Sequence, residues 1–362
     1  MKSVHKNFFL TTESHCVNTE IHGLFLYLYP NLLNMTKHYK WGILAPGRMA
    51  AKFTYGLKIL ENADLYAVGS RDIVRAEKFA KDHGFKKFYG SYEELAQDPA
   101  VDVIYIASPH SHHHDQAILC LKNKKAVICE KAFALNSREA GEMISEARNQ
   151  NVFLMEALWP PFQPFYKKAI EILRSGELGK IKHMHAYFSF NPPFDPSDRK
   201  FNIALGGGSL LDIGIYPVID ALSFMGVPDE IKATASFGET GSEESLSGIF
   251  KYNNGAMATI YSSFRTNIGI GCDILCEKGN LTVSRGRDMN QRVMLALHGR
   301  EKETFVFSPP ALGYHWEAEE VMRCLDEGLT ESPVVPLSFS IDLMKTLDNI
   351  RKTAGIIFPG RD

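Results

Sequence analysis

The chain has 362 residues, of which 45% are hydrophobic and 23% charged, and its formal net charge is -2. This length exceeds that of one typical compact α/β domain, so it predicts two globular domains. A nearly neutral chain with interspersed charges has no basic face. That pattern argues against a nucleic-acid partner and favours a small-molecule ligand.

The first 34 residues differ in pattern from the rest of the chain. The apolar run at 21–33 is too short to span a bilayer and is interrupted by His22 and Pro30. The start also lacks the unbroken apolar stretch and the small-residue cleavage site of a signal peptide. We therefore expect residues 1–34 to be a disordered or non-native extension, with no membrane association, and the structured protein to begin near Met35.

The six cysteines are scattered along the chain, unlike the dense spacing of a secreted disulfide scaffold. We expect them to be reduced core residues of a cytoplasmic protein. Cys272 and Cys276 lie in a strand-like run without a second pair or nearby histidines to complete a zinc site. No metal is expected there.

Residues 35–158 alternate short apolar runs with amphipathic segments, a pattern typical of a parallel sheet with helices on both faces. Two capping boxes, Ser91 with Glu94 and Asn136 with Glu139, predict helix starts. We expect an α/β domain with the Rossmann dinucleotide-binding fold. Its predicted strands are 39–44, 64–69, 101–107, 126–129 and 152–156.

From Trp159 onward, the pattern changes to strands without helices between them, with hairpin turns at Asn254-Gly255 and Lys278-Gly279-Asn280. Residues 159–362 therefore predict an α+β substrate domain with one large, mostly antiparallel sheet. Helices at 209–224, 316–327 and 338–353 would cover one face. The other face would be a liability in water, which favours a homodimer formed through this sheet.

The segment GILAPGRMAAKF joins the first predicted strand to the first helix. In a dinucleotide fold, a tight glycine turn here lets backbone amides and the helix dipole meet the pyrophosphate. Gly47 is present, but Ala45 occupies the first position of the usual G-x-G-x-x-G/A. A plain strand-turn-helix is the alternative; the surrounding βαβ rhythm favours a cofactor site that includes Ala45, Gly47, Arg48 and Met49.

The end of the second strand indicates which dinucleotide binds. An acid there would accept hydrogen bonds from a ribose 2'-hydroxyl, whereas a 2'-phosphate requires positive charge. Ser70 and Arg71 stand at that place, and Arg75 follows one helical turn later. Two guanidiniums and a hydroxyl suit a phosphate, so we expect NADP rather than NAD. The alternative is two solvated arginines, with Arg71 and Asp72 marking a helix start.

Two further motifs carry chemistry. In VICEKAFAL, Glu130 and Lys131 follow a buried strand and so emerge at the carboxyl edge of the sheet, where ligands bind. In GGGSLLDIGIYPVIDAL, Asp212 and Tyr216 are four residues apart and share a helix face. A lysine beside a tyrosine would favour the phenolate and make the tyrosine a general acid for carbonyl reduction. A surface ion pair and a packed aromatic are the alternatives.

The order of motifs GxxxxGRxA, SR, SPHSHHH, EK, MEALW and GGGSLLDIGIY resembles the glucose-fructose oxidoreductase and inositol dehydrogenase family, written Gfo/Idh/MocA. The resemblance runs from about residue 39 to the end, and Arg71, Arg75 and Tyr216 are most similar to the dimeric dihydrodiol dehydrogenase branch. It implies transfer of a hydride between nicotinamide and a hydroxyl or carbonyl carbon of a sugar, polyol or diol. It implies no metal.

The resemblance also implies roles for single residues. Lys131 corresponds to the lysine of the family's E-K-P motif, Tyr216 to the proton donor and acceptor, and Asp212 to the group that orients the substrate hydroxyl. The cofactor side would include Glu130 and the loop residues Ser108, Pro109, His110 and His113, and Trp159 would be a wall of the substrate site. Ala132 replaces the family's proline, so Lys131 could be held less firmly.

Three alternatives remain. A metal bound by the histidines at 112–114 is disfavoured, because three consecutive residues at a helix start cannot all point at one ion. A non-catalytic NADP sensor would not need Lys131, Asp212 and Tyr216 together. A glycosidase that uses tightly bound nicotinamide for transient redox would show no net turnover of added NADP. The substrate depends on side chains that the sequence does not place: Trp159, Asn191, Arg199 and Phe264.

Overall fold

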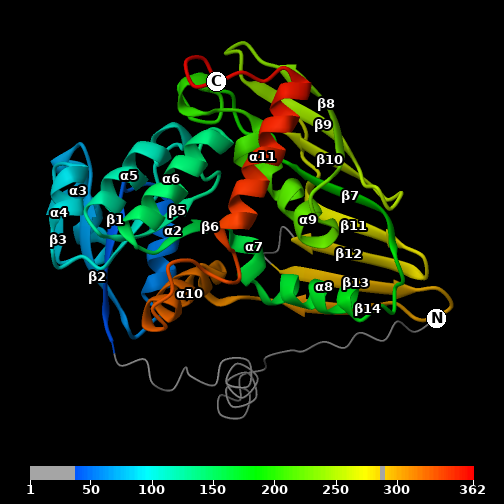
Figure 1. Ribbon diagram of the computed structural model, residues 1–362, viewed down its shortest axis with the longest axis horizontal. Coiled ribbons are helices and arrows are strands. Elements are labelled where there is room, and N and C mark those ends of the chain that lie inside the picture. The colour runs from blue at the N-terminus through cyan, green and yellow to red at the C-terminus, as the bar shows by residue number, and fades with distance from the viewer. Residues whose placement is uncertain (1–36, 286–289) are drawn as a thin grey trace.

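The structure is a computed structural model that describes residues 37–285 and 290–362. Two sheets lie side by side, with most of the helices on and between them (Figure 1). The predicted extension at 1–34 lies outside the described residues.

The first sheet has six parallel strands in the order β3-β2-β1-β4-β5-β6, which confirms the Rossmann prediction. The chain moves outward from β1 in one direction and then restarts at β4 on its other side. A crevice therefore forms at the carboxyl ends of β1 and β4, where ligands bind in such sheets. The strands are β1 (Tyr39–Leu44), β2 (Ala63–Gly69), β3 (Lys87–Tyr89), β4 (Val103–Ile106), β5 (Ala126–Glu130) and β6 (Leu154–Ala157).

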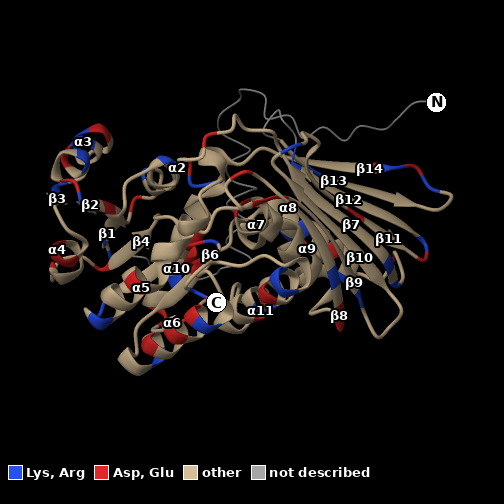
Figure 2. Cartoon of the chain, turned by 90° about the horizontal axis from the view of Figure 1, so that it is seen from above, with Lys and Arg blue, Asp and Glu red and all other residues tan. Residues whose placement is uncertain are grey.

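Helices cover both faces of this sheet, so its inner strands are buried along almost their whole length. The helical elements are α2 (Arg48–Leu57), α3 (Ile73–His83), α4 (Tyr92–Gln97), η2 (His110–His112), α5 (His113–Lys122) and α6 (Ser137–Gln150). Charged residues recur along α3, α5 and α6 (Figure 2).

In the Rossmann half, the helix starts agree with the predictions from the sequence better than the strand ends do. Ser91 Oγ accepts the Glu94 N–H at 3.1 Å, and Asn136 Oδ1 accepts the Glu139 N–H at 2.9 Å, as the capping boxes predict. The prediction was wrong by one or two residues at the ends of β4 and β6, and it omitted β3. β3 is three residues long and partly exposed, so it carries almost no hydrophobic pattern.

The second sheet has eight strands in the order β14-β13-β12-β11-β7-β10-β9-β8. Every neighbouring pair is antiparallel except β7 and β10, which confirms a mostly antiparallel sheet. The strands are β7 (Ile181–Ser189), β8 (Glu230–Phe237), β9 (Glu243–Lys251), β10 (Met257–Ser263), β11 (Gly269–Cys276), β12 (Gly279–Arg285), β13 (Gln291–Leu297) and β14 (Glu303–Phe307).

Two hairpin turns were predicted in this sheet. The β9–β10 turn contains Gly255 at φ 84°, a conformation that glycine adopts without strain. In the β11–β12 hairpin, Cys276 pairs with Gly279, so the turn consists of Glu277 and Lys278, slightly earlier than predicted.

The three helices predicted in the second half are confirmed, at 210–225 as η4 and α9, at 315–326 as α10 and at 337–354 as α11. The prediction that strands follow Trp159 directly was wrong, because α7 and α8 come before β7. In α8, the buried residues Phe165, Ala169 and Ile172 recur at helical spacing. The helical elements are α7 (Trp159–Phe162), α8 (Pro164–Arg174), η3 (Ile203–Leu205), η4 (Leu210–Gly214), α9 (Ile215–Met225), η5 (Pro310–Gly313), α10 (His315–Asp326) and α11 (Leu337–Ala354).

The two C-terminal helices connect the halves rather than simply covering the second sheet. α11 packs against β8 and also against α6, whereas α10 packs against α2 of the first half. The Tyr39 hydroxyl of β1 donates to Asp326 of α10 at 2.6 Å. The end of the chain therefore fixes the Rossmann half against the second sheet. Among the described residues, the one stretch apolar enough for a membrane span, Ile203–Met225, is mostly buried and is a core helix.

Candidate active site

The loop after β1 has the shape that a phosphate site requires. Ala45 adopts φ 65°, the left-handed conformation for which glycine is usual, and its N–H donates to Gly69 O at 3.1 Å. Gly47 caps α2 without a side chain, and a Cβ atom there would lie 4.0 Å from its nearest neighbour. Arg48 and Met49 begin the helix. The residues present fit a dinucleotide pyrophosphate, which would meet free amides at an open helix start.

The end of β2 presents two exposed arginines. Arg71 and Arg75 form no ion pair with any carboxylate in the part of the chain that the structure describes. Asp72 does mark a helix start, since its carboxylate accepts the N–H groups of Val74 and Arg75. Ser70 is buried and its Oγ accepts the Asp72 N–H at 3.2 Å, so only its own hydroxyl hydrogen is left to donate.

The loop after β4 is held to the loop after β5 by a histidine. His113 is fully buried, with Nδ1 2.8 Å from Ala132 O and Nε2 2.9 Å from Ser108 O. Pro109 leads into η2, and the His110 ring lies 3.1 Å from Gly206 O. Burial lowers the pKa of His113 to about 4 and that of His110 to about 3, so both rings are neutral at pH 7.

The three consecutive histidines face different surroundings. His113 is enclosed by backbone carbonyls, whereas His114 pairs with Asp115 and Glu142 on the outside of α5. His112 is partly exposed on the side of Arg71. Within residues 37–285 and 290–362, no group of three or more His, Cys, Asp or Glu side chains is arranged to hold a metal. The five described cysteines are free and buried, as expected.

Lys131 follows β5 and points across to the second half of the protein. Its ammonium donates to the Asp212 backbone carbonyl at 2.6 Å, lies 3.6 Å from Asp212 Oδ1, and sits 5.2 Å from the centre of the Tyr216 ring. Its side chain is only 13% exposed, which excludes a surface ion pair. The Lys131-Ala132 peptide is cis. Glu130, the last residue of β5, accepts the Tyr105 hydroxyl at 2.5 Å through Oε1 and the Lys131 backbone N–H at 3.2 Å through Oε2.

The triple glycine lets Asp212 reach this position. A Cβ atom on Gly207 would lie 2.8 Å from Arg199 O, and one on Gly208 would overlap the Glu243 carboxylate. That carboxylate accepts the Leu210 N–H and so holds the start of η4, a π-helical turn that leads into α9. The close approach also brings Arg199 to Asp212, with Nη2 2.9 Å from Oδ1.

Lys131 and Asp212 form a buried ion pair, and Arg199, whose side chain is 38% exposed, adds a second cation beside the same carboxylate. Burial would raise the pKa of Asp212, but Lys131 and Arg199 together hold it well below its usual range. Burial lowers the pKa of Lys131, and the Asp212 carboxylate opposes this. The carboxylate is therefore ionised and favours the charged form of the lysine beside Tyr216.

Tyr216 stands beside this cluster with its hydroxyl uncommitted, since none of the described residues forms a hydrogen bond with it. Burial, reinforced by Glu130, raises its pKa, and the largest opposing effect comes from Arg285. The sequence predicted that Lys131 alone would lower the pKa of this tyrosine. Arg285 Cζ lies 5.6 Å from the centre of the Tyr216 ring.

Trp159 and Tyr216 share Arg285 as a neighbour. Trp159 begins α7, its indole N–H donates to Leu312 O at 2.8 Å, and Arg285 Cζ lies 5.5 Å from its ring centre. Of the other residues that the sequence could not place, Arg199 joins the site. Phe264 is buried in a separate aromatic cluster and Asn191 is exposed.

Comparison with known proteins shows the family of the chain. The family model described as "Oxidoreductase family, NAD-binding Rossmann fold" matches residues 39–158, and the "GFO/IDH/MocA C-terminal domain" matches residues 166–282. The trans-1,2-dihydrobenzene-1,2-diol dehydrogenase of Mus musculus is 37% identical over 334 residues, covering 88% of this chain and 98% of the relative. The Homo sapiens enzyme of the same name is 36% identical over 339 residues, covering 88% and 98%. The chain belongs to the Gfo/Idh/MocA family.

Solved structures share the fold of this Gfo/Idh/MocA protein. A 3-ketoreductase from Actinomadura kijaniata in complex with NADP and TDP-benzene has a TM-score of 0.80 at 21% identity, covering 88% of this chain and 98% of that one. A levoglucosan dehydrogenase in complex with NADH and L-sorbose has a TM-score of 0.80 at 17% identity, covering 88% and 97%. The former holds NADP and the latter NADH, so the fold accommodates either cofactor.

With relatives named as dehydrogenases and an oxidoreductase family model, this Gfo/Idh/MocA protein is an NAD(P)-dependent oxidoreductase that acts on CH-OH groups. The geometry brings Lys131, Asp212, Tyr216 and Trp159 together from both halves of the chain. Arg71 and Arg75 lie apart from them, at the end of β2 and the start of α3.

The sequence did not single out Arg285. Arg285 follows Leu281 and Val283 at every second position of β12, on the face of the strand that is buried. An arginine at such a position is the sequence signal that could have identified it. Tyr105 and Glu317, buried near Glu130, were also missed. They lie in apolar surroundings where the pattern predicts only core.

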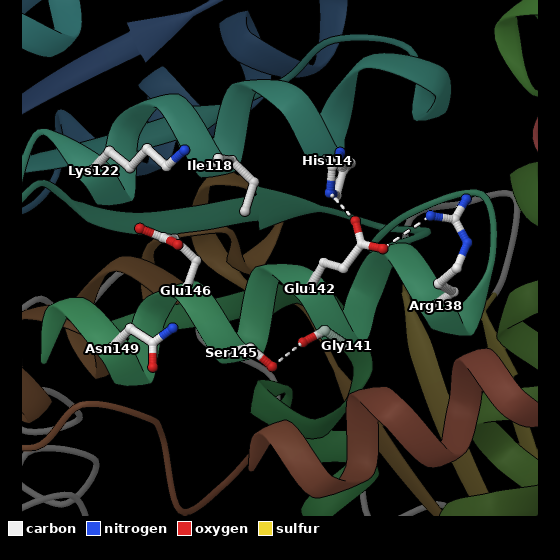
Figure 3. Close-up of a pocket in the computed structure, with 9 residues that line it drawn as sticks. All are labelled: His114, Ile118, Lys122, Arg138, Gly141, Glu142, Ser145, Glu146 and Asn149. Carbon is white, nitrogen blue, oxygen red and sulfur yellow. Dashed lines mark hydrogen bonds and ion pairs between the residues drawn. The ribbon is translucent and has the colours of Figure 1, made fainter.

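One open groove of about 550 Å³ lies elsewhere, between α5 and α6 (Figure 3). Its walls include His114 paired with Glu142, and Glu142 paired with Arg138. None of the residues predicted for the cofactor or the substrate lines it. It is the polar seam between two surface helices.

Proposed function

We propose that the protein is an NADP-dependent dehydrogenase that moves a hydride between nicotinamide and a hydroxyl-bearing or carbonyl carbon of a diol, sugar or polyol. The observation that carries this is the position of Lys131, whose ammonium contacts both Asp212 and the Tyr216 ring. Lys131 belongs to the Rossmann half and the other two to the second half, so the three side chains meet where the halves join.

The chain's own residues account for the proton. When the substrate is oxidised, its hydroxyl proton passes to Tyr216 Oη, which has no competing partner among the described residues. The neighbouring cations stabilise the phenolate that receives the proton. Asp212, held by Arg199, is an ionised acceptor for a second substrate hydroxyl. Bound nicotinamide would supply the hydride acceptor, and in the reverse direction the same tyrosine donates its proton to the carbonyl oxygen.

NADP is proposed over NAD because of the charge at the end of β2. Arg71 and Arg75 are exposed and have no carboxylate partner among the described residues. No acid stands where a 2'-hydroxyl would need one, since Asp72 is engaged as the helix cap. Both guanidiniums are thus available to a 2'-phosphate.

The substrate class is proposed from the neighbourhood of Tyr216. Asp212 offers oxygen acceptors for hydroxyl groups, and Trp159 and Tyr216 offer aromatic surface against which a ring can pack. A ring that carries adjacent hydroxyls uses both. The curated relatives are named for such a molecule, trans-1,2-dihydrobenzene-1,2-diol.

A substrate screen tests the proposal. The protein would be mixed with NADP and, in turn, with trans-1,2-dihydrobenzene-1,2-diol, sugars and polyols, while the absorbance of reduced nicotinamide is followed. We expect NADP reduction with at least one class and a slower reaction with NAD. If no member of the panel reduces either cofactor, the dehydrogenase proposal is wrong.

Two other functions would give different results. A glycosidase with transient redox would carry nicotinamide through purification and cleave glycosides without net turnover of added NADP. A sensor would bind NADP and turn over nothing. The contact of Lys131 with both Asp212 and Tyr216 favours the dehydrogenase, because binding alone does not require those side chains to meet.

We also propose that the protein forms a homodimer through the second sheet. α8, α9 and α11 pack on one face of it, and the described helices leave the other face bare (Figure 2). Ile249, Met257 and Leu275 are 40% to 45% exposed in these strands, which is costly for a lone sheet. Light scattering would then give twice the chain mass.

A further inference from the structure

Arg285 is a cation packed inside an aromatic enclosure. It ends β12, and its guanidinium carbon lies 5.5 Å from the ring centre of Trp159, 5.4 Å from that of Phe165 and 5.6 Å from that of Tyr216. The side chain is only 13% exposed. Cation–ring contacts of this kind strengthen when water is excluded.

Apart from these aromatic rings, the guanidinium has few polar contacts. Among the described residues, none of its three nitrogens has a hydrogen-bond partner. Its ion pair is with Asp220, whose Oδ1 is 3.7 Å from Nη2, beyond hydrogen-bond reach. That Oδ1 is buried and also has no hydrogen-bond partner in the described part of the chain. A purely structural arginine would normally satisfy its donors, whereas the charge of this one is balanced in a low-dielectric interior by the Asp220 carboxylate alone.

Tyr216 lies between two ion pairs. Asp212, Tyr216 and Asp220 follow one another at four-residue intervals along η4 and α9. Lys131 contacts Asp212 and the Tyr216 ring, and Arg285 contacts the Tyr216 ring and Asp220. The tyrosine therefore has a cation within 6 Å of its ring on the side of each carboxylate, at 5.2 Å and 5.6 Å.

We propose that Arg285 is a positioning residue for proton transfer at Tyr216, in which its buried charge stabilises the phenolate and Asp220 moderates that charge. The inference rests on the proposed dehydrogenase function, because it assigns Tyr216 the proton. Other titratable groups also act on this tyrosine. Glu130 at the end of β5, Asp212 in η4 and Glu317 in α10 raise its pKa, and Tyr314 interacts with it electrostatically. The Lys131 ammonium lies 5.2 Å from its ring centre, and Asp220 is one helical turn away on α9.

The sign of each effect follows from charge. The carboxylates oppose formation of a phenolate, and Arg285 has the largest favourable effect on the pKa of Tyr216. Burial raises the pKa of Asp220 to about 6, so this group is ionised at the alkaline pH where the tyrosine titrates. Removing the arginine and removing the carboxylate should therefore move the tyrosine in opposite directions.

The test measures the pH dependence of single-turnover oxidation of trans-1,2-dihydrobenzene-1,2-diol with NADP in three variants. In Arg285→Met, the ascending limb of the pH–rate profile should move to higher pH by about one unit. The rate at a pH below this limb should therefore fall about tenfold. Arg285→Lys keeps the charge and should keep the limb. Asp220→Asn should move it down. If the Met and Lys variants share one limb position, or only KM changes, the charge of Arg285 does not act on Tyr216 and the proposal is wrong.

A second measurement separates this proposal from the proposed function. Tyrosine labelled with carbon-13 at the phenol carbon gives one NMR signal that disappears in Tyr216→Phe, and its shift with pH needs no substrate. The signal should begin to titrate at higher pH in Arg285→Met and at lower pH in Asp220→Asn. If the diol is not oxidised, this titration still shows whether Arg285 and Asp220 act on the pKa of Tyr216. If Arg285→Met does not fold, Arg285→Lys and Asp220→Asn decide, and an unmoved signal in Asp220→Asn overturns the proposal.

Discussion

The charged groups at the two ends of the proposed cofactor site are arranged in opposite ways. At the end of β2, Arg71 and Arg75 are exposed and have no carboxylate partner among the described residues. At the end of β5, Lys131 and Asp212 are buried and paired before any ligand arrives, and Arg199 completes the cluster.

The difference follows from the cost of desolvation. An exposed guanidinium stays hydrated, so it can await the negative charge that a ligand brings. A buried ammonium or carboxylate cannot, because leaving it unpaired costs several kcal/mol. Binding charges can therefore stand alone at the surface, whereas buried charges that act on a reacting proton need a counter-charge within the protein itself.

The largest expected effect is at the buried end. Tyr216→Phe and, separately, Lys131→Met should each lower kcat by about 100-fold or more, because the first removes the proton carrier and the second a cation beside it. The affinity for NADP should change little. Single-turnover absorbance of nicotinamide measures the step, and Tyr55→Phe, at a 56% exposed residue of α2, is the matched control. Hydride transfer at the parent rate in Tyr216→Phe would make Tyr216 only a packed aromatic.

The exposed end should respond in binding and not in stability. Arg71→Ala should weaken NADP by about 10- to 100-fold, the range of a charge-assisted contact, and leave NAD unchanged. Its melting temperature should stay at the parent value, since no described group loses a partner. Calorimetric titration of both cofactors measures this, with Arg148→Ala on α6 as the control. Equal affinities of the parent protein for NADP and NAD would exclude the phosphate site.

The sequence predicts those parts of the fold and the site that short stretches of neighbouring residues determine. The glycine turn, the capping residues and the lysine after β5 follow from short patterns, and so does the division into a parallel and an antiparallel sheet. Arg285 and Arg199 do not, because each becomes part of the site only when strand β12 and the loop before the triple glycine fold over α9. α8 carries apolar residues at helical spacing, so its sequence does contain a helix signal that the prediction of strands alone in this region missed.

The smallest expected effect concerns a buried carboxyl that forms no ion pair with any described residue. Glu156 of β6 is fully buried and accepts the Phe133 N–H at 3.0 Å through Oε1, and its Oε2 meets no hydrogen-bond donor within residues 37–285 and 290–362. Burial raises its pKa from 4.5 to about 8. The comparison of the two ends therefore implies that this carboxyl is held neutral at pH 7, as a buried acid without a pairing cation should be.

The sign of its contribution can be tested by pH. Between the unfolded and folded pKa values, the unfolded chain binds fewer protons than the folded one, so stability falls as pH rises from about 4.5 to about 8. Glu156→Gln keeps the shape and cannot ionise, so it removes this loss. Its melting temperature relative to the parent should rise by about 2 °C or more between pH 5 and pH 8, corresponding to about 1 kcal/mol. Glu61→Gln, at an exposed residue, should show no such rise. Parallel pH profiles for Glu156→Gln and the parent would mean that Glu156 is ionised in the folded protein, and that a buried charge here does not need a cation beside it.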